Sequence, residues 1–553
     1  MAFVSMHAYD ADVWVPQFRG LNQADIQMNP DLRFAAVAEN VETINGVLQP
    51  QAANTFLTNG NAPSAWETNR VETLAVFHRR WYSGEGSKDW YVCCAGGKFY
   101  HKQANAPDMG WEEIPMPEDF ESDHFECSLW SWVTYETNDN NGTIDVLIVS
   151  NAKDGMFMII PPDHYAQWSD IDDYDWDHYS SDTWFDVRDA AQWEIAPVDT
   201  RADPTDDDEP QKKFGVIERY GERIWGTAVE DEPDTLYYSR AYAADDWSAS
   251  GPDEDPSVGG GEIKQPSWDG DQFYALKRFG DQLLAFKKNK IWRVLGLSPG
   301  EYTFHEQYGK GTEYFSTIAV NGERVFMAGR EGALVYDGMD TTPYAKEQIN
   351  QIWKTVNTEA LDQMCAAMFE QRYYLAFPVG ESTVNNAVLV YDMKEGTILY
   401  YPGTQIESFL PADDKLYATS SSLPGKILQI NRDSWALSSA SGKATRWVTP
   451  WIDFGYKRIQ KGGFDFYFLP EVKENPVTFT VSIQTEKKLK AKQYTCQPLS
   501  SAQLALGKEH RVKRMHFGGS GRKFRIIIET EAGVTDPWRL IGGIQIVAET
   551  DPD

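Results

Sequence analysis

The fold is decided by a phrase that is clearest in residues 273–296, FYALKRFGDQLLAFKKNKIWRVLG. A short apolar run meets a turn at Gly280, and a second apolar run ends in Phe286. Such a phrase predicts two or three short strands joined by tight turns. Variants of it occupy residues 214–229, 318–338, 364–379 and, in degraded form, 406–430. Repetition at roughly 40–50 residues predicts an all-β chain built around a β-propeller, in which each copy forms one blade.

The propeller is predicted to span residues 61–435. Seven blades are the preferred number, and six are the main alternative. Residues 70–115 and 124–160 supply the first two blades, and residues 212–435 supply the others. We place an acidic insertion, residues 160–212, between the second blade and the third.

The two ends of the chain lack the blade phrase. From Arg446 onward short strands alternate in polarity, so residues 436–553 are predicted to form a C-terminal antiparallel β-sandwich domain. Residues 1–60 are predicted to form an extended N-terminal arm and a hairpin that closes the propeller. Asn45-Gly46 marks the turn of that hairpin, because both residues tolerate the positive φ angles of a type I′ turn.

Composition limits the class of protein. No apolar run reaches the roughly 18–20 residues of a membrane-spanning helix, and the N-terminus shows no signal-peptide pattern, so we expect no membrane insertion. The five cysteines are odd in number and scattered, which argues against a disulfide framework and for assembly in a reducing cytosol. Cys93 and Cys94 are adjacent, so they should point to opposite faces of a strand and make a poor metal pair.

The formal charge of −32 is the strongest bulk signal. A surface this acidic repels phosphates and excludes non-specific binding of nucleic acid. Residues 443–553 contain 18 Lys and Arg against 12 Asp and Glu, which leaves about −38 on residues 1–442. Such asymmetry suggests that the two parts face different partners, although negative charge can also serve solubility alone.

No motif of catalysis or cofactor binding is found. The chain lacks G-x-S-x-G, H-E-x-x-H and the P-loop, and no G-x-G-x-x-G stands between a strand and a helix. His164 and His178 lie near the acidic segment but are isolated. We therefore predict no catalytic, cofactor-binding or metal-binding residue, no cofactor and no enzymatic activity.

The acidic segment leaves calcium binding open. Its carboxylates could gather oxygen ligands for Ca²⁺, but the run lacks the central Gly and the closing Glu of an EF-hand, so a solvated loop is the preferred interpretation. These residues are Asp170, Asp172, Asp173, Asp175 and Asp177. Aromatic residues in 174–193 could stack on sugars or cap a core, and we favour the core.

The stretch SGEGSKDW (83–90) is similar to the Asp-box turn of sialidases, S-x-D-x-G-x-x-W. Glu85 stands where Asp is expected, and Ser87 stands where Gly is expected. We interpret it as a turn with a packed Trp90.

Three stretches together resemble the tail-nozzle, or packaged-DNA stabilisation, proteins of tailed bacteriophages. The first is FRGLN (18–22) with the hairpin residues Asn40, Val41, Gly46 and Leu48; the second is Leu236, Tyr237, Tyr238, Ser239, Asp246 and Trp247; the third is WVTPWIDFG (447–455). The length and the acidic insertion depart from the short-tailed members of this family. A position as nozzle, collar, hub or baseplate component therefore stays open.

The resemblance implies a structural virion protein, assembled in the cytoplasm of the host bacterium. Its copies would form a ring at the tail axis, with a hexamer favoured, that retains the packaged genome and passes DNA during ejection. Other tail or connector proteins would be its partners, and DNA would pass without specific binding. The acidic charge suits a channel wall along which DNA must slide. The alternative is a receptor- or glycan-binding propeller module, or a polysaccharide hydrolase, of the virion.

Overall fold

The computed structural model describes most of the chain. It covers residues 9–24, 31–57, 63, 66, 69–79, 88–104, 106, 110–117, 120, 122–139, 142–161, 193–206, 208–265, 270–307, 309–454 and 460–551.

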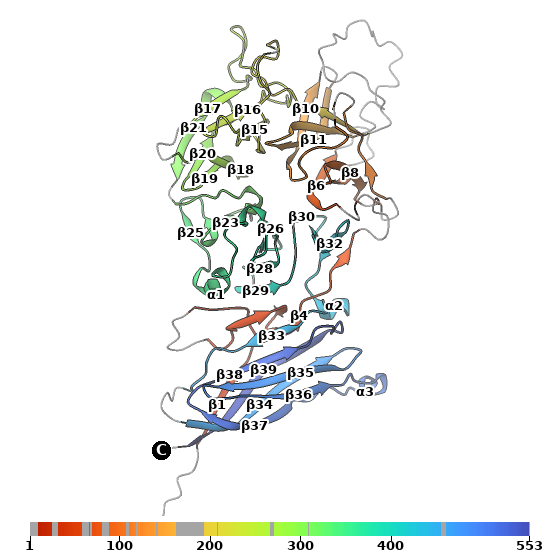
Figure 1. The fold of residues 1–553 in the computed structure, drawn as a ribbon, viewed down its shortest axis with the longest axis vertical. Helices are drawn as coiled ribbons and strands as arrows, with labels where there is room; N and C mark the ends of the chain where they lie inside the picture. Colours follow the sequence, from red (N-terminus) through yellow and green to blue (C-terminus); the bar gives the residue numbers. More distant parts are fainter. Residues whose placement is uncertain are drawn as a thin grey trace, which may run out of the picture.

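Six four-stranded antiparallel sheets and the first four strands of a nine-stranded sheet form a β-propeller of seven blades, which confirms the all-β fold and the preferred number of blades (Figure 1). Blade one contains β6 (Val71–Arg79), β7 (Lys88–Ala95), β8 (Lys98–Gln103) and β9 (Glu112–Glu113). Blade two contains β10 (Ser131–Asp139), β11 (Gly142–Asn151), β12 (Gly155–Ile160) and β13 (Glu194–Pro197). Blade three contains β14 (Val216–Tyr220), β15 (Arg223–Thr227), β16 (Thr235–Tyr238) and β17 (Gly261–Lys264).

The other four blades follow the same plan. Blade four contains β18 (Phe273–Phe279), β19 (Gln282–Lys287), β20 (Ile291–Leu295) and β21 (Thr303–Gln307). Blade five contains β22 (Ala319–Val320), β23 (Val325–Gly329), β24 (Gly332–Tyr336) and β25 (Thr341–Pro343). Blade six contains β26 (Cys365–Phe369), β27 (Arg372–Phe377), β28 (Ala387–Asp392) and β29 (Thr397–Pro402). Blade seven contains β30 (Ser408–Ala412), β31 (Lys415–Thr419), β32 (Ile427–Ile430) and, from the N-terminal segment, β5 (Thr55–Phe56).

Within the described ranges the helices are few and short. They are η3 (Pro299–Glu301), η4 (Phe315–Thr317), η5 (Glu347–Ile349), α1 (Asn350–Trp353), η6 (Leu361–Gln363), α2 (Ser434–Leu437) and α3 (Ser501–Ala505). In the part of the chain that the structure describes, no helix has the length and apolar character needed to cross a bilayer.

A hydrophobic layer lies between each pair of neighbouring blades, because both faces of every sheet are apolar. Cys93 packs with Tyr417 between blades one and seven, whereas Cys94 packs with Phe157 between blades one and two. The two adjacent cysteines therefore point to opposite faces, as the sequence predicts, and all five cysteines are free thiols. Each sheet is thus held by its neighbours on both sides.

Two-residue turns close the hairpins. Both turn residues have positive φ in the Gly221-Glu222, Glu370-Gln371 and Asp413-Asp414 turns. The predicted Asn45-Gly46 turn has φ angles of 51° and 78°, which fits the type I′ geometry that the sequence suggested. Glu370-Gln371 and Asp413-Asp414 contain no glycine, so their residue types do not predict a two-residue turn.

The sandwich contains two sheets. One continues from blade six through β2 (Val37–Glu39) to β33 (Thr445–Val448), β38 (Phe524–Thr530), β35 (Val477–Thr485) and β36 (Leu489–Cys496). The other contains β3 (Val41–Ile44), β4 (Val47–Pro50), β39 (Trp538–Asp551), β34 (Gln460–Val472) and β37 (Lys513–Gly521), with β1 (Tyr9–Val15) paired to β39. Phe479 of the first sheet meets Phe468 and Trp538 of the second, with ring centroids 6.2 and 5.2 Å apart.

One continuous nine-stranded sheet therefore joins the propeller to the sandwich. Glu39 of β2 pairs in parallel with Tyr400 of β29, and Ala38 pairs in antiparallel register with Trp447 of β33. In Figure 1 the sandwich lies below the ring of blades, next to β28 and β29. Backbone hydrogen bonds, not a flexible linker, connect the two parts.

Two expectations from the sequence need correction. Of the predicted N-terminal arm, residues 1–60, β5 completes blade seven and β2 pairs with both β29 of blade six and β33 of the sandwich. The hairpin strands β3 and β4 and the strand β1 pair within the sandwich instead of closing the propeller. The acidic insertion, residues 160–212, does not separate blades two and three, because β13 pairs with β12 and completes blade two. A strand of only four residues after a long polar segment carries no recognisable blade phrase.

A buried ion pair fixes the N-terminal segment to blade six. Arg372 on β27 is 1% exposed, and its guanidinium contacts Asp392 on β28 and lies 3.5 Å from Glu42 on β3. The Glu42 carboxylate also accepts a hydrogen bond from the Tyr401 hydroxyl on β29. Burial lowers the pKa of Arg372, but Glu42 and the other acidic groups outweigh it, so the pKa is raised and the guanidinium stays charged.

Replacing Arg372 with Met should destabilise the protein by about 3–5 kcal/mol, because Glu42 and Asp392 lose their nearest buried counter-charge and only the more distant Arg432 remains. Chemical denaturation of both proteins measures the difference. Arg446→Met is the matched control, since Arg446 pairs with Glu529 at a site where both side chains are about 40% exposed; its cost should stay below about 1 kcal/mol. Equal losses in the two variants would contradict this account of Arg372.

Candidate functional site

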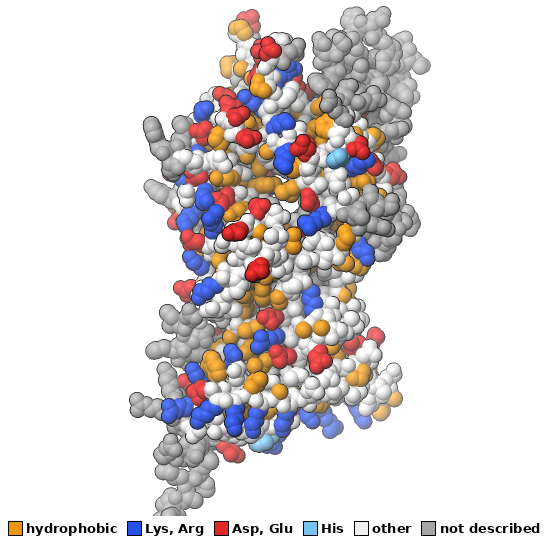
Figure 2. Space-filling view, viewed as in Figure 1, with side chains coloured by type: hydrophobic (Ala, Val, Ile, Leu, Met, Phe, Trp, Pro, Cys, Tyr) orange, Lys and Arg blue, Asp and Glu red, His pale blue; other side chains and the backbone are white. Residues whose placement is uncertain are grey.

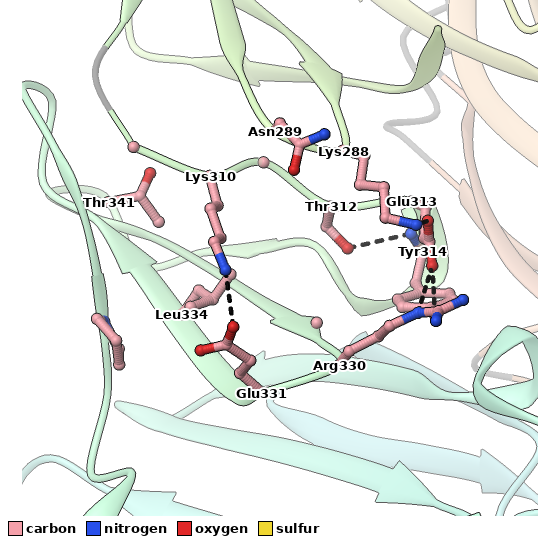
Figure 3. Close-up of a pocket in the computed structure, with 14 residues that line it drawn as sticks. Lys288, Asn289, Lys310, Thr312, Glu313, Tyr314, Arg330, Glu331, Leu334 and Thr341 are labelled. Carbon is pink, nitrogen blue, oxygen red and sulfur yellow. Dashed lines mark hydrogen bonds and ion pairs between the residues drawn. The ribbon is translucent and has the colours of Figure 1, made fainter. Parts of the chain in front are cut away.

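A pocket of about 290 Å³ opens between blades four and five (Figure 3). The β19–β20 turn supplies Lys288 and Asn289, and the strap between β21 and η4 supplies residues 309–314. The β23–β24 turn supplies Arg330 and Glu331. Leu334 on β24 and Pro343 on β25 contribute apolar surface. The walls thus come from four separate segments that only blade packing brings together.

Two groups of ion pairs line this pocket. Glu313 lies 2.7 Å from the Lys288 amine and 3.3 Å from Nε of Arg330, and it accepts a hydrogen bond of 2.7 Å from the Tyr314 hydroxyl. Burial raises the pKa of Glu313, but these donors outweigh it, so the pKa is lowered. On the other side, Glu331 lies 2.7 Å from the Lys310 amine, as Figure 3 shows. Both carboxylates are therefore ionised and already paired with cationic side chains of the pocket.

The chemistry open to this pocket is binding. Lys288, Lys310 and Arg330 outnumber Glu313 and Glu331, so the lining is slightly cationic in a strongly acidic protein. Hydrogen-bond donors over an apolar floor suit a small anionic or zwitterionic ligand. Its lining contains no Ser, Cys or Thr with an adjacent base, so nothing in it resembles an activated nucleophile.

The strap reaches its place because Gly311 has no side chain. A Cβ at Gly311 would lie 2.1 Å from the carbonyl oxygen of Lys287 and 2.6 Å from that of Lys290. Backbone of two blades meets at this point, and only glycine permits the approach.

Gly311→Ala should therefore destabilise the protein by about 2 kcal/mol or more, because backbone atoms must move apart. Urea denaturation measures the effect. Gly300→Ala provides the control, because a Cβ at Gly300 meets nothing within 4 Å; its effect should lie within about 0.5 kcal/mol. If Gly311→Ala were as mild as Gly300→Ala, the close approach would not constrain the fold.

A second pocket, of about 140 Å³, lies where the innermost strands of several blades begin. Arg70 and Glu72 come from blade one, Asp362 precedes blade six, and Glu407 precedes blade seven. The side chain of Glu407 is 12% exposed, and Nε of Arg70 lies 3.7 Å from it. Burial raises the pKa of Glu72 and of Glu407, although Arg70 opposes the shift in both. This end of the propeller axis is thus lined by carboxyl groups held partly away from water.

The raised pKa of Glu407 predicts the sign of a pH effect. A carboxyl whose pKa is higher in the folded than in the unfolded protein destabilises the fold when ionised. That cost is absent well below the unfolded value of 4.5 and grows as the pH rises above it. Glu407→Gln should therefore raise the melting temperature at about pH 8, and the gain should shrink towards about pH 4.

Thermal unfolding across that pH range tests this expectation. Glu359→Gln is the control, because Glu359 is exposed and should change the melting temperature little at any pH. A Glu407→Gln protein that melts at or below the wild-type temperature at about pH 8 would show that ionised Glu407 carries no cost.

Most of the residues that the sequence singled out fall outside the part of the chain that the structure describes. His164, His178 and the acidic run Asp170–Asp177 lie outside the described residues, as do residues 83–87 of SGEGSKDW. Trp90, at the end of that stretch, packs against Trp193 and His101, with ring centroids 5.2 and 5.5 Å apart. Within the described ranges, no group of three or more His, Cys, Asp or Glu could hold a metal ion.

The pocket residues carried no sequence signal. Lys288, Lys310, Arg330 and Thr341 are separated by long stretches and belong to different turns. Only the phrase Gly309-Lys310-Gly311-Thr312, between two strands, could have drawn attention to the strap.

Charge is distributed unevenly over the surface. Figure 2 shows Lys and Arg side chains in a row along the lower edge of the sandwich, where Figure 1 places β36 and β37. Residues 486–525, which include both strands, contain 11 Lys and Arg and only two Asp and Glu. The basic character of the C-terminal part is thus concentrated at the edge farthest from the propeller.

Comparison with known proteins assigns this chain to no family. No protein-family model matches this chain, and no curated protein matches it. Among solved structures, the chain is similar to one described as "AfRom2 CNH domain", with 9% identity over 69% of this chain and 99% of that chain and a TM-score of 0.37. It is also similar to the Pan2 WD40 domain of Neurospora crassa, with 9% identity over 70% of this chain and 96% of that chain and a TM-score of 0.35.

Proposed function

We propose that this protein is a structural component of a tailed-bacteriophage virion. Copies assembled in the host cytoplasm form a ring at the tail axis, as a nozzle, hub or connector. The ring retains the packaged genome and passes DNA during ejection. The proposal starts from the resemblance of residues 18–22, 236–247 and 447–455 to the tail-nozzle family.

The observation that carries the proposal is the division of charge between the two parts. Residues 1–442, which include all blades, carry a formal charge of about −38, whereas residues 443–553 carry more Lys and Arg than Asp and Glu. A channel wall past which DNA slides must not bind the phosphates of the DNA. Cationic side chains bind phosphates by releasing counterions from the DNA, and acidic side chains do not. The basic sandwich edge is then available for contacts with acidic neighbours.

The joined sheet supports a mechanical role. Because β2 pairs with β33 at three residues and with β29 at Glu39 and Tyr400, a force applied to the sandwich reaches the propeller through backbone hydrogen bonds. In this role no residue is catalytic and no cofactor is required. Closure and opening of the tube depend on how copies and neighbouring tail proteins are arranged.

Electron microscopy of intact particles and of the purified protein tests this function. We expect a closed ring on the tail axis, with an opening at least as wide as duplex DNA, about 20 Å. Particles in which this protein occupies no axial position would overturn the proposal.

A second candidate, a ligand-binding module of the virion, is favoured by the pocket between blades four and five. Its cationic lining suits an acidic sugar. Glycan-array binding by the wild-type protein, lost in Lys310→Ala and Arg330→Ala, would support this role. Binding that both variants retain would place the ligand elsewhere.

A further inference from the structure

The second pocket, of about 140 Å³, gathers residues of five blades at the propeller axis. Glu72 lies at the start of β6, Asp362 lies in η6 before β26, and Glu407 lies just before β30. Segments that precede β10 and β22 complete the wall. Both β6 and β26 lie beside β30, near the centre of the ring (Figure 1). Because these segments lead into innermost strands, the pocket lies on the axis and within a single copy of the chain.

Carboxylates outnumber cations in this pocket. Of the described residues that line it, Glu72, Asp362 and Glu407 are acidic and only Arg70 is basic. Nε of Arg70 lies 3.7 Å from the Glu407 carboxylate, which is too far for a hydrogen bond, and about half of the Arg70 side chain is exposed. Burial raises the pKa of Glu407, and the charge of Glu72 adds to the rise, although Arg70 opposes it. The charges of these acids are therefore only partly balanced.

A buried amide beside these acids has an unpaired oxygen. Asn385, which precedes β28, lines the pocket and is 2% exposed. Its Nδ2 donates hydrogen bonds to the carbonyl oxygens of Gln363 and Ile406, at 2.5 and 2.8 Å, which fixes the orientation of the amide. Its Oδ1 is buried and accepts no hydrogen bond from any described residue. Buried polar atoms normally have a partner, so this oxygen is suited to a donor from a ligand.

Apolar side chains form another part of the wall. Leu129, Met364 and Val384 line the pocket. Leu129 is 41% exposed and Met364 is fully buried, so apolar surface extends from the rim to the interior. The three acids do not form a metal site, because no group of three or more His, Cys, Asp or Glu in the described ranges could hold a metal ion. Hydrogen-bond acceptors beside apolar walls suit an organic cation with an alkyl stem.

We propose that this axial pocket binds the ammonium group of an alkylamine. An ammonium group carries three N–H donors and no acceptor, which suits the carboxylates of Glu72 and Glu407 and the unpaired Oδ1 of Asn385. Its charge offsets the surplus of acids, and its alkyl stem covers the apolar wall. The site lies within one copy, so it goes beyond the ring that we propose and does not depend on it.

The cost of an ionised Glu407 is consistent with this site. Without a cation beside it, the buried carboxylate destabilises the fold, as its raised pKa indicates. Acids held in a cleft at a cost to stability are commonly part of a functional site. A bound ammonium group would remove that cost, because it supplies the missing counter-charge and hydrogen-bond donors.

NMR spectroscopy of the full-length protein with isotope-labelled methionine methyl groups tests the site. Met364 lines the pocket, whereas Met515 on β37 of the sandwich reports non-specific change. Met364→Leu assigns the pocket resonance. At about pH 8, where the carboxyls are ionised and the amine is protonated, n-butylammonium chloride should shift the Met364 resonance and leave that of Met515 in place. The shift should saturate with a Kd of about 1 mM, which is reasonable for so small a ligand. Sodium chloride keeps the ionic strength constant, and n-butanol, which has no charge, should not bind.

Substitution of one acid provides the decisive comparison. Glu407→Gln keeps the size of the side chain and should weaken the binding of n-butylammonium at least about tenfold, because a hydrogen bond to a charged group is lost. The protein should not lose stability, since Glu407→Gln removes a buried charge, so weaker binding cannot be attributed to unfolding. Glu531→Gln is the control, because Glu531 is exposed in the sandwich, and its Kd should stay within about twofold of the wild-type value.

Three outcomes would overturn the proposal. These are a Met364 resonance that stays in place up to about 20 mM amine, binding of n-butanol as tight as that of n-butylammonium, or a Glu407→Gln protein that binds as tightly as wild type. If n-butylammonium binds, putrescine and N-acetyl-lysine amide separate the two sources of the group. Tighter binding of putrescine assigns a free diamine, and tighter binding of the amide assigns a lysine side chain of a partner protein. Imaging of particles judges the proposed ring separately.

Discussion

The structure depends on the pairing of one short segment, residues 37–56, with every major part of the molecule. β2 adds to the outer strand of blade six and starts the first sandwich sheet, β3 and β4 enter the second sheet, and β5 completes blade seven. A propeller must close its ring, and here the closing strand is covalently continuous with the bridge to the sandwich. The buried contact of Arg372 with Glu42 and Asp392 holds the same segment in place, because an uncompensated charge at that depth would be costly. Loss of this segment would therefore open the ring and detach the sandwich together.

The formal charge differs between the propeller and the sandwich. Residues 1–442 carry the acidic surplus, and the cations of residues 486–525 lie at the side of the sandwich away from the blades. Like charges on neighbouring propellers would repel each other. The same acidic surplus keeps phosphates at a distance, which is consistent with the role beside DNA that we propose.

The sequence predicted the architecture well where local patterning decides it. Repeated phrases such as residues 273–296 gave the blades, and Asn45-Gly46 gave a hairpin turn of the expected geometry. Prediction from the sequence failed for strands whose place depends on distant partners. β13 is only four residues long, and β2 is recognised only from its position between β29 and β33. The sequence could not predict the pocket between blades four and five either, because Lys288 and Arg330 are distant in the chain and come together only when the blades pack. Turns without glycine, such as Glu370-Gln371, are stabilised by the sheets that they join, not by their own residues.

Native-state hydrogen exchange of the full-length protein tests the central claim most directly. If residues 37–56 bind the propeller and the sandwich into one cooperative unit, the backbone amides of β2 should exchange as slowly as those of β28 in blade six and β38 in the sandwich. All three should lose protection together as denaturant is added. Amides of β2 that exchange much faster than both neighbours, or a sandwich that opens well before the blades, would contradict the account.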